Sequence, residues 1–162
     1  MEQSVFHPIE PIYNAQSRVL ILGSFPSRKS REEMFYYAHP QNRFWRVLSL
    51  VFDCSMPKTP EEKTAFLLSH KIALWDVIAS CRIVSSSDSS ICDVIPNDLM
   101  PILSASRIER IFVNGKTAEK FYCRYSEEQT GRKALYLPST SPANAAWSLE
   151  RLVGEWKKLA DF

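Results

Sequence analysis

Four short apolar segments, each followed by a polar turn, restrict the folds open to this chain more than any other feature of its sequence. Runs of this length are typical of strands that are buried on both faces of a parallel sheet. The segments between them carry apolar residues at helical spacing, so strands and helices alternate along the chain. This order predicts an α/β domain with a mainly parallel four-stranded central sheet. The four expected strands are Arg18–Leu22, Ile72–Val77, Arg110–Val113 and Ala134–Leu137.

The expected helices lie between these strands. One has a clear start, because Thr59 can cap it, Pro60 suits its first turn, and Glu62 completes a capping box. The others are predicted from the spacing of their apolar residues or from a capping residue. The expected helices are 41–52, 60–69, a short helix capped by Asn97 and ending near Leu103, 116–125, and a final helix after Asn144.

Three polar turns follow three of the expected strands. They are Gly23–Ser27 (GSFPS), Asn114–Lys116 (NGK) and Pro138–Asn144 (PSTSPAN). In open parallel sheets, ligands bind beyond the carboxyl ends of the strands. The sequence therefore predicts a binding site on the rim where these three turns meet.

The segment Tyr36–Trp45, YYAHPQNRFW, combines aromatic rings with a histidine, a neutral amide and an arginine. Aromatic rings stack on bases, and an amide both donates and accepts hydrogen bonds. Pro40 disfavours helix before it, so a helix is expected to begin near Gln41 and to place Asn42 and Arg43 in its first turn. Free backbone N–H groups there favour an anion. The apolar residues of this helix are expected to fill the core: Phe44, Trp45 and Leu48.

Length and composition fit one domain with one core, spanning residues 1–162. Apolar residues make up 45% of the chain, and its formal charge is +2, so any nucleic-acid binding must rely on local patches. No apolar run approaches the length of a membrane span, and we expect a monomeric, cytoplasmic protein without membrane contact. The four cysteines, Cys54, Cys81, Cys92 and Cys123, lack metal-site spacing, so they are assigned to packing and no metal or cofactor is expected.

Three further segments are expected at the surface. Residues 1–16 contain two prolines and no clear period, and we expect them to wrap around one edge of the domain. Arg28, Lys29 and Arg31 form a basic cluster that either faces a nucleic acid or is an ordinary solvated loop. Ser85–Ser90 is almost entirely serine and is expected to form a flexible loop.

Taken together, the motifs GSFPS, YYAHPQNRFW, NGKTA and PSTSPANA resemble the uracil-DNA glycosylase superfamily, and more closely its deoxyinosine (hypoxanthine) branch. ALWDV, the serines around Asp88 and Pro96-Asn97-Asp98 are also similar to that branch. The resemblance spans Arg18 to Trp156. It implies a three-layer αβα fold, a flipped-out nucleotide, and hydrolysis of its N-glycosidic bond without a metal, as a step of base excision repair.

The resemblance also implies roles for individual segments. GSFPS matches a turn that surrounds the base and the catalytic water, and PSTSPANA matches a loop that presses into the minor groove. This chain has Phe25 where many branches have an asparagine or aspartate, and Thr140 where many have a histidine. In the deoxyinosine branch, the asparagine of the aromatic segment carries the catalytic role, which corresponds to Asn42.

These considerations predict three groups of site residues and no metal ligand. The catalytic residue is Asn42. The base-binding residues are Gly23, Ser24, Phe25, Pro26, Ser27, Tyr36, Tyr37, His39 and Asn114. The residues that contact double- or single-stranded DNA with a deaminated base are Arg28, Lys29, Arg31, Arg43, Lys116, Ser139, Ser141, Pro142, Ala143 and Asn144.

The expected chemistry does not need a general base. A neutral amide does not titrate near pH 7, but a base that leaves early requires only a positioned water and donors for the departing anion. Asn42 either positions that water or reads the base, and the stacking ring is Phe25, Tyr36 or Tyr37. Hypoxanthine is the expected base, and uracil is expected to be removed poorly or not at all. Open alternatives are a uracil- or mismatch-specific glycosylase, a single-strand binding module, a nucleotide-sensing homologue, and a small-molecule α/β enzyme.

Overall fold

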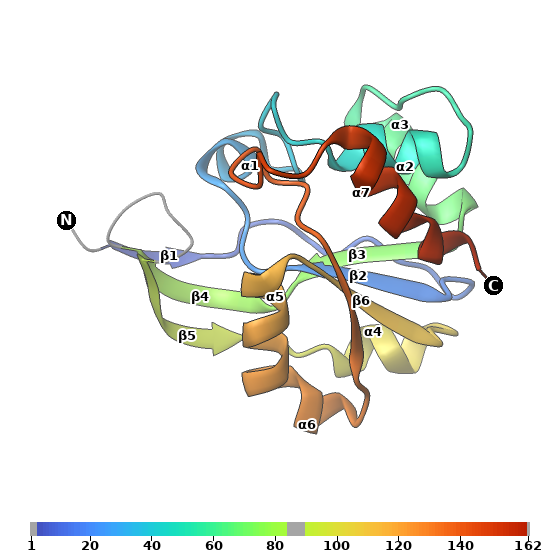
Figure 1. Ribbon diagram of the computed structural model, residues 1–162. Coiled ribbons are helices and arrows are strands. Elements are labelled where there is room, and N and C mark those ends of the chain that lie inside the picture. Colours follow the sequence, from blue (N-terminus) through green and yellow to red (C-terminus); the bar gives the residue numbers. More distant parts are fainter. Residues whose placement is uncertain (1–2, 84–89, 162) are drawn as a thin grey trace.

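A parallel four-stranded sheet forms the centre of the computed structural model, which describes residues 3–83 and 90–161 (Figure 1). Its strands are β2 (Val19–Gly23), β3 (Ile72–Asp76), β6 (Arg110–Asn114) and β7 (Ala134–Leu137), in the order β3-β2-β6-β7. Each neighbouring pair is parallel, which confirms the predicted sheet and all four of its strands. The expected serine-rich loop falls almost entirely on residues 84–89, outside the described part of the chain.

Helices cover both faces of this sheet, which gives the expected three layers. Val19 and Ile21 of β2 point into one core, while Leu20 and Leu22 point into a second core, because side chains alternate along a strand. The first core is closed by α2 (Phe44–Val51), α3 (Pro60–Ser69) and α7 (Leu149–Trp156). The second is closed by α4 (Met100–Ala105) and α5 (Lys116–Phe121), on the opposite side of the sheet in Figure 1.

The remaining helical elements are short. They are α1 (Arg28–Glu33), a π-helical turn at Tyr122–Ser126 that continues α5, α6 (Glu127–Thr130) and a 3₁₀ turn at Lys157–Ala160. The capping box of α3 is present as predicted, with Thr59 accepting from the Glu62 N–H. Within the described residues, no helix is long and apolar enough to span a membrane.

A second, antiparallel sheet was not predicted. Its strands are β1 (Gln3–Phe6), β4 (Ile78–Ile83) and β5 (Ile91–Pro96), in the order β1-β4-β5. β4 begins two residues after β3 ends, so one continuous segment of chain passes from the parallel sheet into the antiparallel sheet. Residues 7–16 then follow the outer edge of β3, where Ile12 and Leu74 exchange backbone hydrogen bonds of 3.0 and 2.9 Å.

Asn97 does not cap a helix, contrary to the prediction. Its side chain is buried, and its Nδ2 donates to the carbonyls of Asp76 at 2.9 Å and Ile78 at 3.2 Å. These bonds fix the bend where the chain passes from β3 to β4. The following helix, α4, begins at Met100 after an N-cap at Leu99 that makes no side-chain capping bond.

Candidate active site

A cleft of about 1160 Å³ opens at the carboxyl ends of β2, β3 and β6. Every site residue predicted from the sequence lines this cleft, with the exception of Arg43. The three polar turns therefore do meet on one rim, as the strand order predicted. The cleft also includes polar and aromatic residues outside the predicted sets of site residues: Ser30, Asp76, Thr117, Tyr136, Thr140 and Trp147.

The turn after β2 leads directly into α1. Backbone N–H groups of Val77 and Ile78 donate to the carbonyls of Gly23 and Ser24, which ties this turn to the β3–β4 bend. Ser27 then caps α1 by accepting from the Ser30 N–H at 3.2 Å. The basic cluster is thus helical, and not the loop that the sequence suggested.

The cations of α1 remain at the surface beside the cleft. Arg28 pairs with Glu32 at 3.2 Å and Lys29 with Glu33 at 3.1 Å, both one helical turn apart and largely exposed. Exposed pairs of this kind are weak, so both cations stay available to an anion of higher charge. Arg31 instead donates to the Pro26 carbonyl at 2.9 Å, where burial lowers its pKa from the ordinary value.

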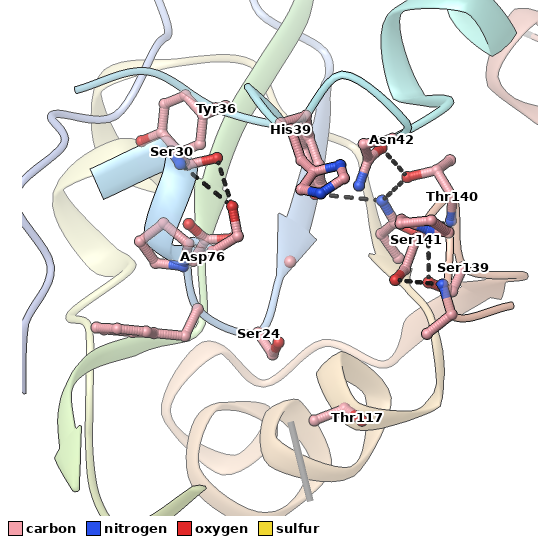
Figure 2. A pocket seen from close by; sticks show the side chains of 18 of the residues that line it. Ser24, Ser30, Tyr36, His39, Asn42, Asp76, Thr117, Ser139, Thr140 and Ser141 are labelled. Atoms are coloured by element: carbon pink, nitrogen blue, oxygen red, sulfur yellow. Dashed lines mark hydrogen bonds between the residues drawn. The ribbon is translucent and has the colours of Figure 1, made fainter. Parts of the chain in front are cut away.

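Asn42 lies at the centre of a hydrogen-bonded network that joins three segments of the chain (Figure 2). Its Oδ1 accepts from the Phe44 N–H at 2.9 Å and from the Thr140 hydroxyl at 2.9 Å. Asn114, at the end of β6, donates from Nδ2 to Thr140 Oγ1 at 3.1 Å and to the Tyr37 hydroxyl at 3.2 Å. The Thr140 N–H returns a bond to Asn114 Oδ1 at 3.1 Å.

This network fixes the orientation of the Asn42 amide. The Phe44 N–H can only donate, so the atom that faces it must be the oxygen. Both lone pairs of that oxygen are then in use, and the Nδ2 group is left to face the cleft with two N–H donors. Because Asn42 Oδ1 accepts the hydrogen bond from the Phe44 N–H, α2 starts at Phe44 and not at Gln41 as predicted.

Arg43 supports the loop 139–147 and does not line the cleft. Its guanidinium donates to the carbonyls of Trp147, Ser141 (3.3 Å) and Asn144 (3.0 Å), and its own N–H donates to the Thr140 carbonyl at 3.1 Å. A guanidinium engaged in this way is a backbone clamp, so the structure does not support its predicted role as a phosphate ligand.

Hydrogen bonds within the loop 139–147 also fix its conformation. Asn144 Nδ2 donates to the Ser139 carbonyl at 2.9 Å, and the Ser139 and Ser141 hydroxyls accept from backbone N–H groups two residues further on. Ser148 caps α7 by accepting from the Arg151 N–H at 3.2 Å. The exposed tip of the loop is Pro142 and Ala143.

The three aromatic candidates for base stacking are placed differently. Tyr36 is 2% exposed, its hydroxyl donates to the Glu10 carbonyl at 2.7 Å, and burial raises its pKa far above the usual range. Tyr36 therefore packs within the wall of the cleft and has no exposed ring face on which a base could stack. Tyr37 has a left-handed backbone (φ 52°) and stacks on Phe44 with ring centroids 4.0 Å apart. Phe25, 9% exposed, and Tyr37 both line the cleft and stay candidates for stacking on the base.

Asp76 is the most informative residue that sequence reasoning missed. It ends β3 on the rim and lines the cleft, and its carboxylate contacts the ring nitrogen of His7, 69 positions earlier. The rule that ligands bind at strand ends would have identified Asp76, because it directly follows an apolar run. Nothing in the sequence indicated its pairing with His7.

The described residues contain no candidate metal site. No group of three or more His, Cys, Asp or Glu side chains in 3–83 and 90–161 is placed to hold an ion. Metal-independent action stays a prediction that requires a direct test.

Comparison with known proteins gives a consistent result. The family model of the uracil DNA glycosylase superfamily matches residues 10–160. A hypoxanthine DNA glycosylase of Methanosarcina acetivorans is 31% identical over 148 residues, which cover 90% of this chain and 92% of that protein. One of Methanosarcina barkeri is 29% identical over 113 residues, covering 68% and 72%. A solution NMR structure of an M. acetivorans protein described as a uracil DNA glycosylase has a TM-score of 0.79 and 27% identity, and covers 99% of both chains.

Proposed function

The chain belongs to the uracil DNA glycosylase superfamily, and from this membership we propose that it is a monofunctional DNA glycosylase that releases hypoxanthine from deoxyinosine. It would act early in base excision repair, on a nucleotide flipped out of the DNA into the cleft. Action as a monomer in the cytoplasm is part of the same proposal. The names of the two Methanosarcina relatives support this choice of base.

One observation carries the proposal: the amide of Asn42 is locked with its two N–H donors toward the cleft. When the bond between the base and C1′ breaks, its electrons go to the base, which leaves as an anion. Donors that are already in place stabilise that charge without reorganising during the reaction. Water then adds to C1′ of the oxocarbenium-like sugar and releases a proton to solvent, from which the base anion takes up a proton.

Both lone pairs of the Asn42 oxygen are occupied, which supports one of the two roles considered for this residue. An amide oxygen with two occupied lone pairs neither orients a water nor accepts from a base N–H. We therefore assign Asn42 to donation toward the departing base. The contact to a base N–H must come from another group.

The cations beside the cleft suit a DNA substrate. Arg28 and Lys29 on α1 and Lys116 at the start of α5 are exposed and line the same opening. We propose that they contact phosphates on either side of the flipped nucleotide. Phosphate contacts hold the duplex in register and carry no sequence information, which is what a damage-specific enzyme needs.

The test is single-turnover cleavage of matched duplexes that carry inosine, uracil, xanthosine or adenosine. Wild type should cleave inosine fastest, and Asn42→Ala should lose about 100-fold or more of that rate, as expected when a fixed donor is removed. Gln41→Ala is the matched control, because Gln41 is exposed and does not line the cleft. Near wild-type cleavage by Asn42→Ala would remove the proposed role of this residue.

Uracil removal is the second candidate function. It is favoured by the description of the similar NMR structure, which names uracil and not hypoxanthine. The same panel of duplexes decides between the two activities. Uracil cleavage as fast as inosine cleavage would replace the proposed substrate without changing the class of reaction.

A further inference from the structure

One tight turn presents two polar side chains to the cleft, and the proposed function uses only one of them. His39 and Asn42 are the first and last residues of this turn, which is closed by the Asn42 N–H donating to the His39 carbonyl at 2.9 Å. Pro40 takes the second position, where its fixed φ favours a turn. Both side chains line the cleft, and Figure 2 shows them next to each other. The imidazole of His39 therefore stands beside the amide to which we assign catalysis.

The hydrogen bonds of His39 show which ring nitrogen carries the proton. The Gln41 N–H donates to His39 Nδ1 at 3.1 Å, so Nδ1 is an acceptor without a proton. The proton of the neutral ring is therefore on Nε2. Within residues 3–83 and 90–161, no group forms a hydrogen bond with this nitrogen. The turn thus supplies the cleft with an N–H donor that has no partner in the described protein.

Two neighbouring N–H donors match the edge of a purine better than that of a pyrimidine. Hypoxanthine presents two neighbouring acceptors, the oxygen at C6 and N7, as guanine does in the major groove. On the corresponding edge of uracil, the oxygen at C4 lies beside a C–H group. Only a purine can therefore accept from both side chains of the turn.

The contact at N7 also bears on the chemical step. When the bond between N9 and C1′ breaks, its electrons pass to the purine, and the negative charge spreads over the five-membered ring to N7. A donor at N7 therefore forms a stronger hydrogen bond as the base departs. The Gln41 N–H fixes the tautomer of His39 before the reaction begins. No proton is transferred in this step.

Resting on the proposed function, we propose that His39 is a second catalytic residue, whose Nε2–H donates to N7 of the departing purine while Asn42 donates to the oxygen at C6. The pair favours hypoxanthine over uracil, because removal of a pyrimidine uses only one of the two side chains. Adenine is disfavoured because its 6-amino group would face the NH₂ group of Asn42. Guanine presents the same two acceptors and is set apart by its 2-amino group, which neither donor contacts.

The first test compares binding of two duplexes that differ at one ring atom. One carries inosine opposite thymine, and the other carries 7-deazainosine, in which a C–H group replaces N7. Both have a 2′-fluoroarabino sugar, whose fluorine disfavours the oxocarbenium-like state and so prevents cleavage. Wild type should bind the inosine duplex at least about fivefold more tightly, because the analogue leaves the His39 donor unpaired. Equal dissociation constants would overturn the inference without any variant.

His39→Asn removes this donor and keeps the turn. Asparagine accepts from the N–H two residues further on, as in Asx turns, so the contact with Gln41 is preserved, but its side chain is too short to place an N–H where Nε2 lies. The two dissociation constants should then agree within about twofold. Single-turnover cleavage of ordinary inosine at saturating enzyme should slow by about 100-fold, while the melting temperature stays that of the wild type.

A third duplex and two further variants separate the contact at N7 from general effects. A 2′-fluoroarabino uridine duplex has no N7, so His39→Asn should bind it as the wild type does. His39→Gln places an N–H near the position of Nε2 and should regain at least about tenfold of the lost rate. His70→Asn makes the same substitution at a histidine outside the cleft, where Nδ1 contacts the Phe66 carbonyl, and it should leave the binding ratio unchanged.

Two outcomes would sink the inference. One is cleavage of inosine by His39→Asn at the wild-type rate. The other is equally weakened binding of the inosine and 7-deazainosine duplexes with their ratio preserved, which would mean that His39 contacts a phosphate or the sugar. Failure of the wild type to cleave inosine at all would instead refute the proposed function, and the binding comparison would still report on the contact at N7.

Discussion

The orientation of a single amide determines what Asn42 can contribute to the reaction. Its oxygen is committed to the Phe44 N–H and the Thr140 hydroxyl, and its NH₂ group faces the cleft. If Asn42 positioned water through its side-chain oxygen, replacement by aspartate would preserve activity. If Asn42 stabilises an anion through its NH₂ group, the same replacement would abolish this contribution.

Asn42→Asp therefore separates the two roles. Aspartate can accept both existing hydrogen bonds, so we expect the melting temperature to stay close to that of the wild type. The rate of inosine cleavage should fall by about 100-fold or more, because two donors are replaced by a negative charge facing a departing anion. Single-turnover rates and thermal unfolding measure the two effects. If Asn42→Asp were as active as the wild type, the result would support a role for Asn42 in positioning water.

The sequence identified residues that line the cleft where a residue type and its place on the rim were sufficient, while the roles of these residues stay predictions. Asn42, Asn114 and the GSFPS turn all line the cleft as expected. The guanidinium of Arg43 donates to three backbone carbonyls, which the sequence did not indicate, because a cation near a predicted DNA-binding surface gives no sign of such contacts. His7 was missed because only the tertiary fold brings it to Asp76.

At the scale of elements, α1 presents the exposed cations that we assign to phosphate binding. Lys29→Gln should weaken binding of damaged and undamaged duplexes equally, and it should lower the salt slope of log K by about one unit, since one phosphate contact is lost. Its ion pair with Glu33 is too exposed for its loss to affect folding.

Lys158→Gln provides the matched control for this prediction. Lys158 is a similarly exposed lysine with an ion pair to Glu155 at 3.2 Å, and it does not line the cleft. Salt titrations of DNA binding should show an unchanged slope for this control. An unchanged slope for Lys29→Gln as well would make α1 an ordinary solvated helix.

The loop 139–147 depends on the guanidinium of Arg43 for its shape. Arg43→Lys keeps the charge but cannot reach three carbonyls at once, so we expect a loss of stability of about 1–3 kcal/mol. If the Pro142–Ala143 tip enters the minor groove, the loosened loop should impair cleavage of duplex more than of single strands. Equal defects on the two substrates would assign the loop a purely structural role.

Element boundaries were predictable where local chemistry sets them. The capping box at Thr59 and Glu62 and the four parallel strands appear where the sequence placed them. α1 was missed because its six residues, RKSREE, carry no apolar stripe, and its cap is a serine within a turn motif. α2 starts later than predicted because an asparagine side chain satisfies its first free N–H group.

At the scale of the whole molecule, the two sheets are joined by one continuous segment of chain, in which β4 follows β3 directly. The parallel sheet was predictable, since its strands are apolar throughout and are separated by helical segments. The antiparallel sheet was not, because β5 is only partly buried and β1 lies in a segment with no clear period. Its pairing is set by contacts between residues about 80 positions apart, such as Gln3 with Ile83.

The junction between the two sheets gives the last prediction. Asn97 is 7% exposed, and its side chain satisfies the carbonyls of Asp76 and Ile78 on the two sides of the bend. Asn97→Ala leaves both carbonyls without this partner, and we expect a loss of about 2–4 kcal/mol in the free energy of unfolding, measured by denaturant titration. Asn97→Asp, which places a carboxylate against the same carbonyls, should be at least as destabilising. Asn14→Ala, at a surface turn, should cost much less. Wild-type stability in Asn97→Ala would show that the side chain of Asn97 does not stabilise the bend.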